Sequence, residues 1–473
     1  MRFWAKLTKA EWALIALFLI TLPFVRAQVR EDGVSYYGVT RSLVVDHNLQ
    51  FNGDWKDREG PLVPGRDQMG RPVMLRVSKT GHIPVHSPIG ASLLWMPFVA
   101  ATHGSILVLD HFGGHIRADG FSEPYLVTMA GATCLFAFLG LWLSFCLARR
   151  YVGERWAFLA TIALWLATSL PAYLYVDPAW SHAHSVFVVA LFLWYWNRTR
   201  ENRTAPQWFL LGLIFGLMAE VYFPNAALVF LLLVELVSTA TKSTAVDEHL
   251  SLFAIARNYA LCVLAALIAF IPTFVIRTIL LGSPFAAGAY GGQTWNWKSP
   301  EYLRVLLSPS QGLLTTTPIV IAAIIGLFLL PRRDKVLGKG LIASCIAFCT
   351  IIAMYPFWNL GPAFGNRYFI SLIPAFISGL AVLLDDLAHL HRDAGAIARR
   401  AWVVAALLIV WNLGLVFQWS AGLMPDVGRV YWSEVLYNEF RIVPSEALHA
   451  LHSRFSFHND QHDDPRAIDA LAP

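Results

Sequence analysis

Charged side chains are scarce in this sequence of 473 residues, in which Asp, Glu, Lys and Arg together make up 14%. A soluble domain carries roughly 25% of such residues. Hydrophobic residues reach 56%, and the mean hydropathy is +0.53. The chain has too few polar side chains to cover a water-facing surface. The composition therefore excludes a largely soluble chain and predicts an integral membrane protein.

Cysteine is also rare, and its placement excludes two kinds of site. All of the cysteines lie inside apolar runs: Cys134, Cys146, Cys262, Cys345 and Cys349. We therefore expect neither structural disulfides nor a cysteine metal site in this protein. Cys345 and Cys349 share one helix face, where packing is the favoured interpretation.

Long apolar runs fill most of the chain. They cover residues 125–148, 156–176, 260–276, 313–330, 341–357 and 402–417. A run of about 20 residues spans the hydrocarbon core as a helix, and the alternation typical of a membrane barrel is absent. The sequence predicts an all-α polytopic membrane domain in residues 1–423, with about eleven transmembrane helices by length, and a polar C-terminal tail in residues 424–473.

The basic residues predict how the chain is oriented. The net charge of +5 does not indicate a nucleic-acid partner, because the positive residues fall in short loops such as 149–150, 198–203 and 332–335. The positive-inside rule places these loops in the cytoplasm. The remaining loops then lie on the outer face: residues 26–124, 177–184, 278–311 and 358–367.

Several segments need individual interpretation. The run ending at Val25 is either a retained first helix, which we favour, or a cleaved signal peptide. In the first outer loop, residues 35–45 are expected to form a juxtamembrane helix. Residues 88–109 are interpreted as re-entrant or interfacial, because a full crossing would put the next basic loop outside. Residues 208–236 are too long for one span, and the break at 220–225 predicts two short helices.

Candidate functional residues begin just after the first helix. Glu31 and Asp32 form a carboxylate pair that can bind a divalent metal or supply a general base, although they also suit an ordinary polar helix flank. His82 and His86 precede an apolar segment beside Pro and Gly. They are either phosphate or metal contacts at the lip of a cavity or unremarkable loop residues.

Later segments add polar candidates on the same face. Asp177, His182 and His184 surround the start of a membrane helix, where such residues are costly unless they are paired or face water. Arg367 opposes the positive-inside bias, and its planar guanidinium suits bidentate binding of a phosphate. An aromatic- and glycine-rich loop, which suits either the membrane interface or the faces of sugars, carries two more cations: Lys298 and Arg304.

Together these motifs resemble those of a known superfamily. Asp32 and Tyr36 match the Asp and Tyr of a motif in which Gly33 here replaces a Glu. The segment from His86 to Ile89 is similar to a basic-Pro-Pro-Leu stretch, and the run ending in Arg367-Tyr368 is similar to a Gly-x-Arg-Tyr motif. The order and sidedness resemble the GT-C superfamily of lipid-linked glycosyltransferases, in particular protein mannosyltransferases, aminoarabinose transferases and their bacterial relatives.

The resemblance implies a GT-C-like fold with juxtamembrane helices in the first outer loop. It implies a glycosyltransferase of the bacterial inner membrane that moves a sugar from a polyprenyl-phosphate donor to a glycan, lipid or protein acceptor, with inversion. Asp32, with Glu31 as its partner or as a fellow ligand of a divalent metal, would accept the acceptor's proton. The donor phosphate would meet the cations of the same face: Arg367, His86, Lys298 and Arg304.

Two other functions stay open. A transporter or lipid flippase of envelope polysaccharide synthesis would favour charge pairs near the bilayer midplane, whereas the polar clusters here lie at helix ends. A non-catalytic assembly protein would tolerate replacement of Asp32 and Arg367.

Overall fold

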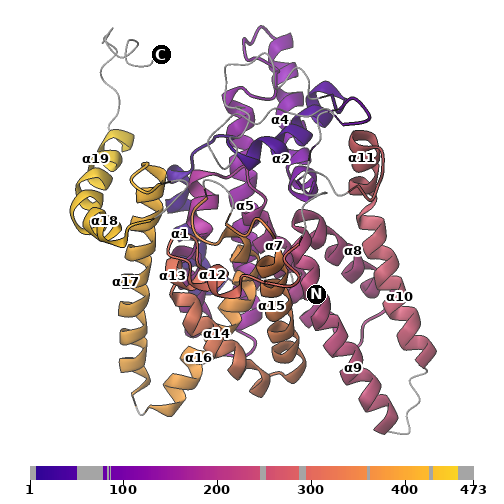
Figure 1. The fold of residues 1–473 in the computed structure, drawn as a ribbon, viewed down its shortest axis with the longest axis vertical. Coiled ribbons are helices and arrows are strands. Elements are labelled where there is room, and N and C mark those ends of the chain that lie inside the picture. The colour runs from indigo at the N-terminus through magenta and orange to yellow at the C-terminus, as the bar shows by residue number, and fades with distance from the viewer. Residues whose placement is uncertain are drawn as a thin grey trace.

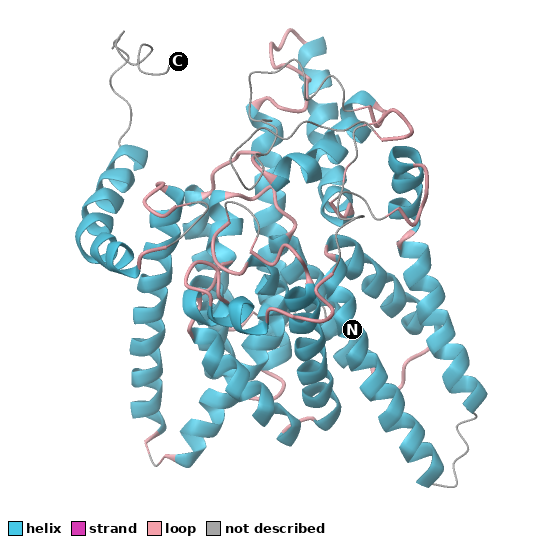
Figure 2. Cartoon of the chain, viewed as in Figure 1, coloured by secondary structure: helices cyan, strands magenta, loops and turns pink. Residues whose placement is uncertain are grey.

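The structure is a computed structural model that describes residues 7–50, 78–82, 85, 87–245, 252–286, 295–359, 363–391, 393–425 and 430–455. Within these residues every regular element is a helix (Figure 2), which confirms the predicted all-α fold class. His86 and most of the loop expected between residues 52 and 79 lie outside the described residues.

The helices are labelled in chain order (Figure 1), and η marks short turns of 3-10 or π type. The first half contains α1 (Lys9–Thr21), η1 (Leu22–Phe24), α2 (Asp32–Arg41), η2 (Ser42–Asp46), α4 (Gly90–His111), α5 (Glu123–Ala148), α6 (Glu154–Leu166), η3 (Ala172–Val176), α7 (His182–Thr199), α8 (Ala205–Val221), η4 (Phe223–Leu228) and α9 (Val229–Ala245). The second half contains α10 (Leu252–Ala269), α11 (Ile271–Leu281), α12 (Tyr302–Leu307), α13 (Leu313–Thr316), α14 (Ile319–Leu329), η6 (Leu330–Arg332), α15 (Lys335–Met354), η7 (Arg367–Leu372), α16 (Ile373–Leu390), α17 (Ala394–Ser420), α18 (Trp432–Tyr437), η8 (Asn438–Ile442) and α19 (Val443–Phe455).

Several of these helices are long and apolar enough to cross a bilayer. In the described part of the chain there are 6 such helices, or up to 7 when α10 and α11, which bend by 40° at Phe270, count as one span. The protein is therefore a multi-pass membrane protein. Shorter apolar helices, α8 and α14 with η6, pack in the same bundle, and about eleven spans by length remains a prediction.

Two of the predicted segments have the expected local structure. The break in the long apolar run lies between α8 and α9, where η4 begins at Phe223. The juxtamembrane helix expected at residues 35–45 is α2 with η2. The first helix belongs to the bundle: Leu14 of α1 is buried, and Phe18 stacks on Phe138 of α5 with ring centroids 4.4 Å apart.

Small residues let the central helices approach closely. A Cβ on Gly326 of α14 would lie 1.8 Å from the carbonyl oxygen of Gly379 on α16. Such contact between backbones is typical of membrane helices, which associate by close packing because lipid supplies little hydrophobic drive. The α14–α16 pair fixes one wall of the bundle below the loops that carry Arg367.

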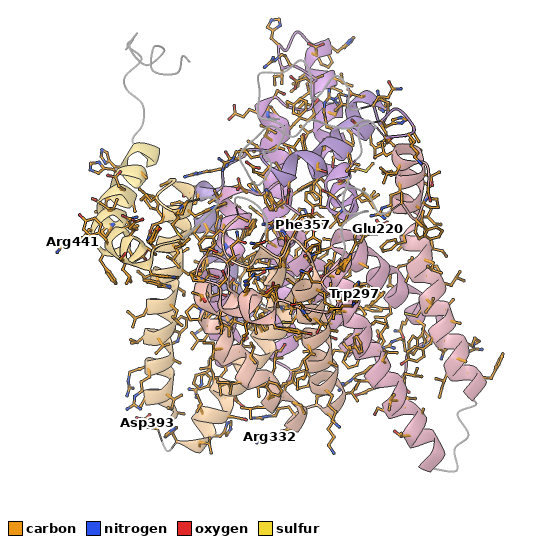
Figure 3. The ribbon with its side chains drawn as sticks, in the orientation of Figure 1. Glu220, Trp297, Arg332, Phe357, Asp393 and Arg441 are labelled. Atoms are coloured by element: carbon orange, nitrogen blue, oxygen red, sulfur yellow. The ribbon has the colours of Figure 1, made fainter. Side chains whose placement is uncertain are left out.

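The basic loops converge on one face, as the charge pattern predicts. Arg149 pairs with Glu11 at 3.0 Å, Arg200 with Asp334 at 2.5 Å, and Arg333 with Asp385 at 2.9 Å. The first pair joins α1 to the α5–α6 connection, the second joins the α7–α8 connection to the η6–α15 connection, and the third joins the η6–α15 connection to α16. We call this end of the bundle the basic face; the labelled Arg332 and Asp393 lie at this end, away from Phe357 and Trp297 (Figure 3).

The helix α4 runs along the half of α5 that is remote from the basic face. Trp95 Nε1 donates to Thr133 Oγ1 (2.9 Å), and further along, His103 Nδ1 and Tyr125 OH are 2.6 Å apart. α4 therefore starts near the middle of α5 and leads away from the basic face (Figure 1). By length and composition alone α4 could span a bilayer, but these contacts favour the re-entrant or interfacial interpretation.

Part of the predicted polar tail is helical. The helices α18 and α19 flank the η8 turn, and Gln418 Nε2 of α17 donates to Glu439 Oε2 of η8 (2.6 Å). Burial raises the pKa of Glu439, and the Gln418 hydrogen bond opposes that shift. This segment thus docks on the end of α17 that is remote from the basic face (Figure 1).

Candidate active site

A cavity of about 420 Å³ opens on the side of the bundle away from the basic face. We call it the Asp32 cavity. Its walls come from α2, α7, the α8–η4 break, the end of α15 and the start of η7. The lining residues are Asp32, Tyr36, Ser87, Pro88, His182, Tyr222, Phe223, Pro224, Trp295, Trp297, Ile351, Ile352, Tyr355, Arg367 and Tyr368.

A tight turn places Asp32 at the start of α2. The Gly33 amide donates to the Arg30 carbonyl (2.9 Å), and Glu31 between them adopts φ 50°, ψ −128°. This combination is one that glycine normally occupies, and such local strain persists only where surrounding structure holds it. The Asp32 carboxylate remains 55% exposed, so solvent and ligands can reach it.

The segment before Asp32 is anchored to the start of the α7 region. Arg30 donates to the Asp177 carboxylate at 3.0 Å, and Gln28 Nε2 donates to the Val176 carbonyl at 2.7 Å. Burial raises the pKa of Asp177, and the Arg30 guanidinium opposes that shift. Asp177 does not line the Asp32 cavity; its contacts hold the turn that presents Asp32.

Gly33 stands where the motif that Asp32 and Tyr36 resemble has a Glu, and the local packing shows why a Glu does not fit. A Cβ at this position would lie 2.7 Å from Ala179 Cβ and 3.3 Å from its carbonyl oxygen. Real Cβ atoms do not approach so closely, so the packing of α2 on this loop leaves no room for the Glu of the related motif. Only glycine fits without displacing the backbone.

Arg367 reaches the cavity from a buried position. Its side chain is 9% exposed, and its guanidinium lies 4.7 Å above the Trp180 ring and 5.0 Å from the Tyr368 ring. Aromatic faces stabilise a cation that has lost its water. Arg367 Nη2 is 3.4 Å from Asp32 Oδ2, so the carboxylate of the first loop and the guanidinium of the late segment meet.

The preceding residues fix where Arg367 points. Gly365 has φ 57°, a left-handed conformation that favours glycine, and a Cβ there would lie 2.5 Å from Ser169 Oγ. Asn366 Nδ2 then donates to the Val305 carbonyl of α12 at 3.1 Å. The Gly-Asn-Arg-Tyr run is therefore a turn that aims one cation into the cavity.

Aromatic rings form the opposite wall of the cavity. Trp295 stacks with Trp297 (centroids 5.9 Å apart) and contacts Tyr355, which in turn meets Tyr368. Tyr368 and Tyr222 are nearly parallel at 6.2 Å. A largely apolar cavity with a few converging polar groups is the usual form of a ligand site.

The other predicted residues lie apart from the cavity. Lys298 is exposed, and Arg304 pairs with Glu301 at 3.4 Å on the surface. His82 Nδ1 contacts Thr80 Oγ1 at 3.1 Å, and His184 packs between Trp95 and Phe136. Their assignment to the site stays a prediction that this geometry does not support, whereas Asp32, Tyr36, His182 and Arg367 all line the cavity.

The carboxylates do not assemble a convincing metal site. Among the described residues no group of three or more His, Cys, Asp or Glu side chains could hold a metal ion. Asp32 already faces Arg367, which would compete with a bound cation. Within the described ranges, the divalent metal predicted at Glu31 and Asp32 therefore has no third protein ligand.

Sequence reasoning did not single out several lining residues. Tyr222 and Phe223 come from the break between α8 and η4, while Ile351, Ile352 and Tyr355 end α15. The Phe-Pro pair within an apolar run was the available signal for the first group. The second group resembles any other helix end, and only the fold brings it to the cavity.

Comparison with known proteins identifies the fold. No protein-family model matches the sequence, and no curated protein matches it. The structure of ArnT from Cupriavidus metallidurans bound to undecaprenyl phosphate is 15% identical, with a TM-score of 0.48 over 94% of this chain and 78% of that one. The oligosaccharyltransferase AglB from Archaeoglobus fulgidus, in complex with an inhibitory peptide and a dolichol-phosphate, is 12% identical, with a TM-score of 0.51 over 96% of this chain and 61% of that one. The likeness to AglB shows that this chain shares the fold of that protein.

Proposed function

We propose that this protein is a glycosyltransferase that moves a sugar from a polyprenyl-phosphate donor to an acceptor hydroxyl at the outer face of the bacterial inner membrane. The observation that carries the proposal is the meeting of Asp32 and Arg367, 3.4 Å apart, at a largely apolar cavity among membrane helices. The AglB structure, which has the same fold, contains a dolichol-phosphate. The acceptor is a glycan, a lipid or a protein.

The reaction follows from the roles these two groups can take. Asp32 accepts the proton of the acceptor hydroxyl while that oxygen attacks the anomeric carbon of the sugar. The bond from the anomeric carbon to the phosphate oxygen breaks, and its electron pair leaves with the polyprenyl phosphate. Attack opposite the leaving group inverts the configuration. Arg367 stabilises the departing phosphate, a contribution worth about 3–4 kcal/mol for one well-placed donor.

The ion pair suggests an order of events. In the structure Arg367 faces Asp32, so the base and the phosphate-binding group are engaged with each other. The donor phosphate is a diester with one negative charge that accepts two parallel bonds from a guanidinium, and the departing polyprenyl phosphate gains a second charge. Donor binding therefore displaces Asp32 from Arg367 and releases the carboxylate to act as a base.

The direct test replaces the carboxylate without changing its shape. Asp32→Asn is expected to lower sugar transfer at least ~100-fold, because general base catalysis contributes about 10²–10⁴. Envelope lipids and glycans are compared by mass spectrometry in a strain that lacks the gene and carries either the wild type or the variant. Glu301→Gln is the matched control, because Glu301 is an outer carboxylate that does not line the cavity.

Transfer at the wild-type level by Asp32→Asn, at equal protein level, ends the catalytic assignment. Loss of activity in both Asp32→Asn and Glu301→Gln would show a general effect on the outer loops instead. Arg367→Lys keeps the charge but loses the planar fork, and it is expected to weaken donor use more than it affects the amount of folded protein.

A further inference from the structure

His182 is a buried polar side chain without an explanation in the fold. It is the first residue of α7, is 3% exposed, and lines the Asp32 cavity. Its Nδ1 atom is buried and has no hydrogen-bond partner among the described residues. Buried polar atoms are almost always hydrogen-bonded, and leaving one without a partner destabilises the folded state. An imidazole at a cavity wall whose Nδ1 atom has no partner in the described part of the chain therefore points to a ligand.

The surroundings of His182 are those of Arg367. The imidazole ring lies 5.9 Å from the Trp180 ring and 6.2 Å from the Tyr368 ring. The Arg367 guanidinium lies against the same two rings, at 4.7 and 5.0 Å. The two side chains thus share one aromatic frame at the wall of one cavity, although they come from segments nearly 200 residues apart in sequence.

This pairing selects the chemistry of the ligand. A second cation beside a buried guanidinium would be repelled, so His182 acts as a neutral imidazole with one N–H donor. A ligand that satisfies both groups has several acceptor oxygens and negative charge. A phosphate has both properties, whereas a sugar hydroxyl would not need the cation and an isoprenoid chain would need neither group.

We propose that His182 is a phosphate-binding residue that donates a hydrogen bond to the donor's phosphate while Arg367 neutralises its charge. This inference rests on the proposed function and assigns to His182 a role in the same site. The Nδ1 atom without a partner then lowers the stability of the protein without donor and raises its affinity for the donor phosphate.

The chain supplies a matched control two residues further along the same helix. His184 is fully buried, but its ring packs at 4.8 Å from Trp95 and 5.5 Å from Phe136 and does not line the cavity. A substitution at His184 therefore perturbs the same part of α7 without changing a residue that lines the Asp32 cavity.

The experiment measures binding by the purified full-length protein in detergent, by calorimetry and by ligand-induced shifts of thermal unfolding. The probes are a polyprenyl phosphate, the matching polyprenol and inorganic phosphate. His182→Phe is expected to weaken polyprenyl-phosphate binding about 10- to 100-fold, the effect of one hydrogen bond to a charged group. It should leave polyprenol binding unchanged and should not lower the unfolding temperature of the empty protein. His184→Phe should leave phosphate affinity at the wild-type level.

His182→Gln provides a second variant, because it retains an N–H donor and is expected to bind polyprenyl phosphate better than His182→Phe. In one outcome, inorganic phosphate raises the unfolding temperature of the wild type but not that of His182→Phe. This result would show that His182 recognises the phosphate group itself. Protection by the polyprenyl phosphate alone would assign the site to the lipid-linked form, and both results support the proposal.

Two results would overturn the proposal. One is wild-type affinity for polyprenyl phosphate in His182→Phe; the other is an equal loss for polyprenol, which would make His182 a packing residue. If the wild type itself does not distinguish polyprenyl phosphate from polyprenol, the proposed function fails, and that result is separate from a failure of the His182 assignment.

Discussion

Asp32 depends on a neighbour that has no side chain. Gly33 lets α2 rest on the loop that carries Ala179, and the strained backbone of Glu31 turns the carboxylate toward Arg367. The same close approach removes the acidic residue that the related motif has at this position. At the scale of single residues, therefore, the turn that positions Asp32 requires a glycine at position 33, where the resemblance predicts an acidic residue.

This dependence predicts a large effect from one added methyl group. Gly33→Ala forces its Cβ into Ala179, and overpacking of this kind costs about 1–3 kcal/mol. We expect a lower unfolding temperature and weaker sugar transfer, measured on the purified variant and in the complemented strain. Gly38→Ala on the same helix is the control, because a Cβ there meets no heavy atom within 4 Å. Similar behaviour of the two variants would contradict the role given to Gly33.

At the scale of elements, the Asp32 cavity depends on the break between α8 and α9. Where α8 ends, Asn225 Nδ2 donates to the Met218 carbonyl (2.9 Å) and to Ser185 Oγ of α7 (2.7 Å). The Met218 carbonyl also accepts a long bond from the Tyr222 amide (3.4 Å), so Asn225 adds a second donor at the end of α8 and ties the break to α7. Polar groups within a membrane need such partners from the protein itself. The break can then present Tyr222 to the cavity in place of a continuous helix.

Near the basic face a buried ion pair joins α9 to the connection between α7 and α8. Glu235 of α9 accepts from Trp196 Nε1 of α7 (2.9 Å) and pairs at 3.4 Å with Arg203, whose side chain is 1% exposed. Glu235→Ala would leave Arg203 buried and unpaired, which is expected to cost about 3–5 kcal/mol and to appear as early thermal unfolding.

Arg399→Ala serves as the comparison for that variant. Its pair with Asp393 is 3.8 Å long and both side chains are largely exposed, so an effect of about 0–1 kcal/mol is expected. If the two variants lose the same free energy of unfolding, burial does not make the Arg203–Glu235 pair more important for stability than the exposed pair.

At the scale of the whole molecule, charge and chemistry are separated along the bundle. The basic loops pair with acidic residues at one face, and the Asp32 cavity lies away from it. The positive-inside rule predicts that the basic face is cytoplasmic. This prediction, together with the proposed function, puts the cavity on the side where we expect a lipid-linked donor to meet its acceptor.

Reporter fusions test this orientation. A fusion after Tyr151 is expected to report a cytoplasmic position, and a fusion after Phe112, between α4 and α5, an outer one. Alkaline phosphatase and green fluorescent protein read opposite compartments, so each site is measured twice. A cytoplasmic signal after Phe112 would mean that α4 crosses the membrane, and the assignment of the first outer loop would need revision.

Much of this architecture could be predicted from the sequence because it depends on local composition. Apolar run length indicates helices in lipid, and the Phe-Pro interruption indicates the α8–α9 break. Arg367 also stood out, since a cation on the outer side needs a reason. Lys298 and Arg304 looked equally suitable by charge, yet they lie outside the cavity, because composition does not reveal which way a loop folds over a helix end.

The sequence by itself determined that this protein lies in a lipid bilayer and that its spans are helices. It also indicated the face on which the polar groups gather, because a bilayer permits few alternatives. Only the tertiary structure decided which of those polar groups meet. The contact of Asp32 with Arg367 joins residues more than 300 positions apart, and the aromatic frame around His182 is built from separate segments. Such contacts depend on how helices pack against one another, and that information is spread over the whole chain.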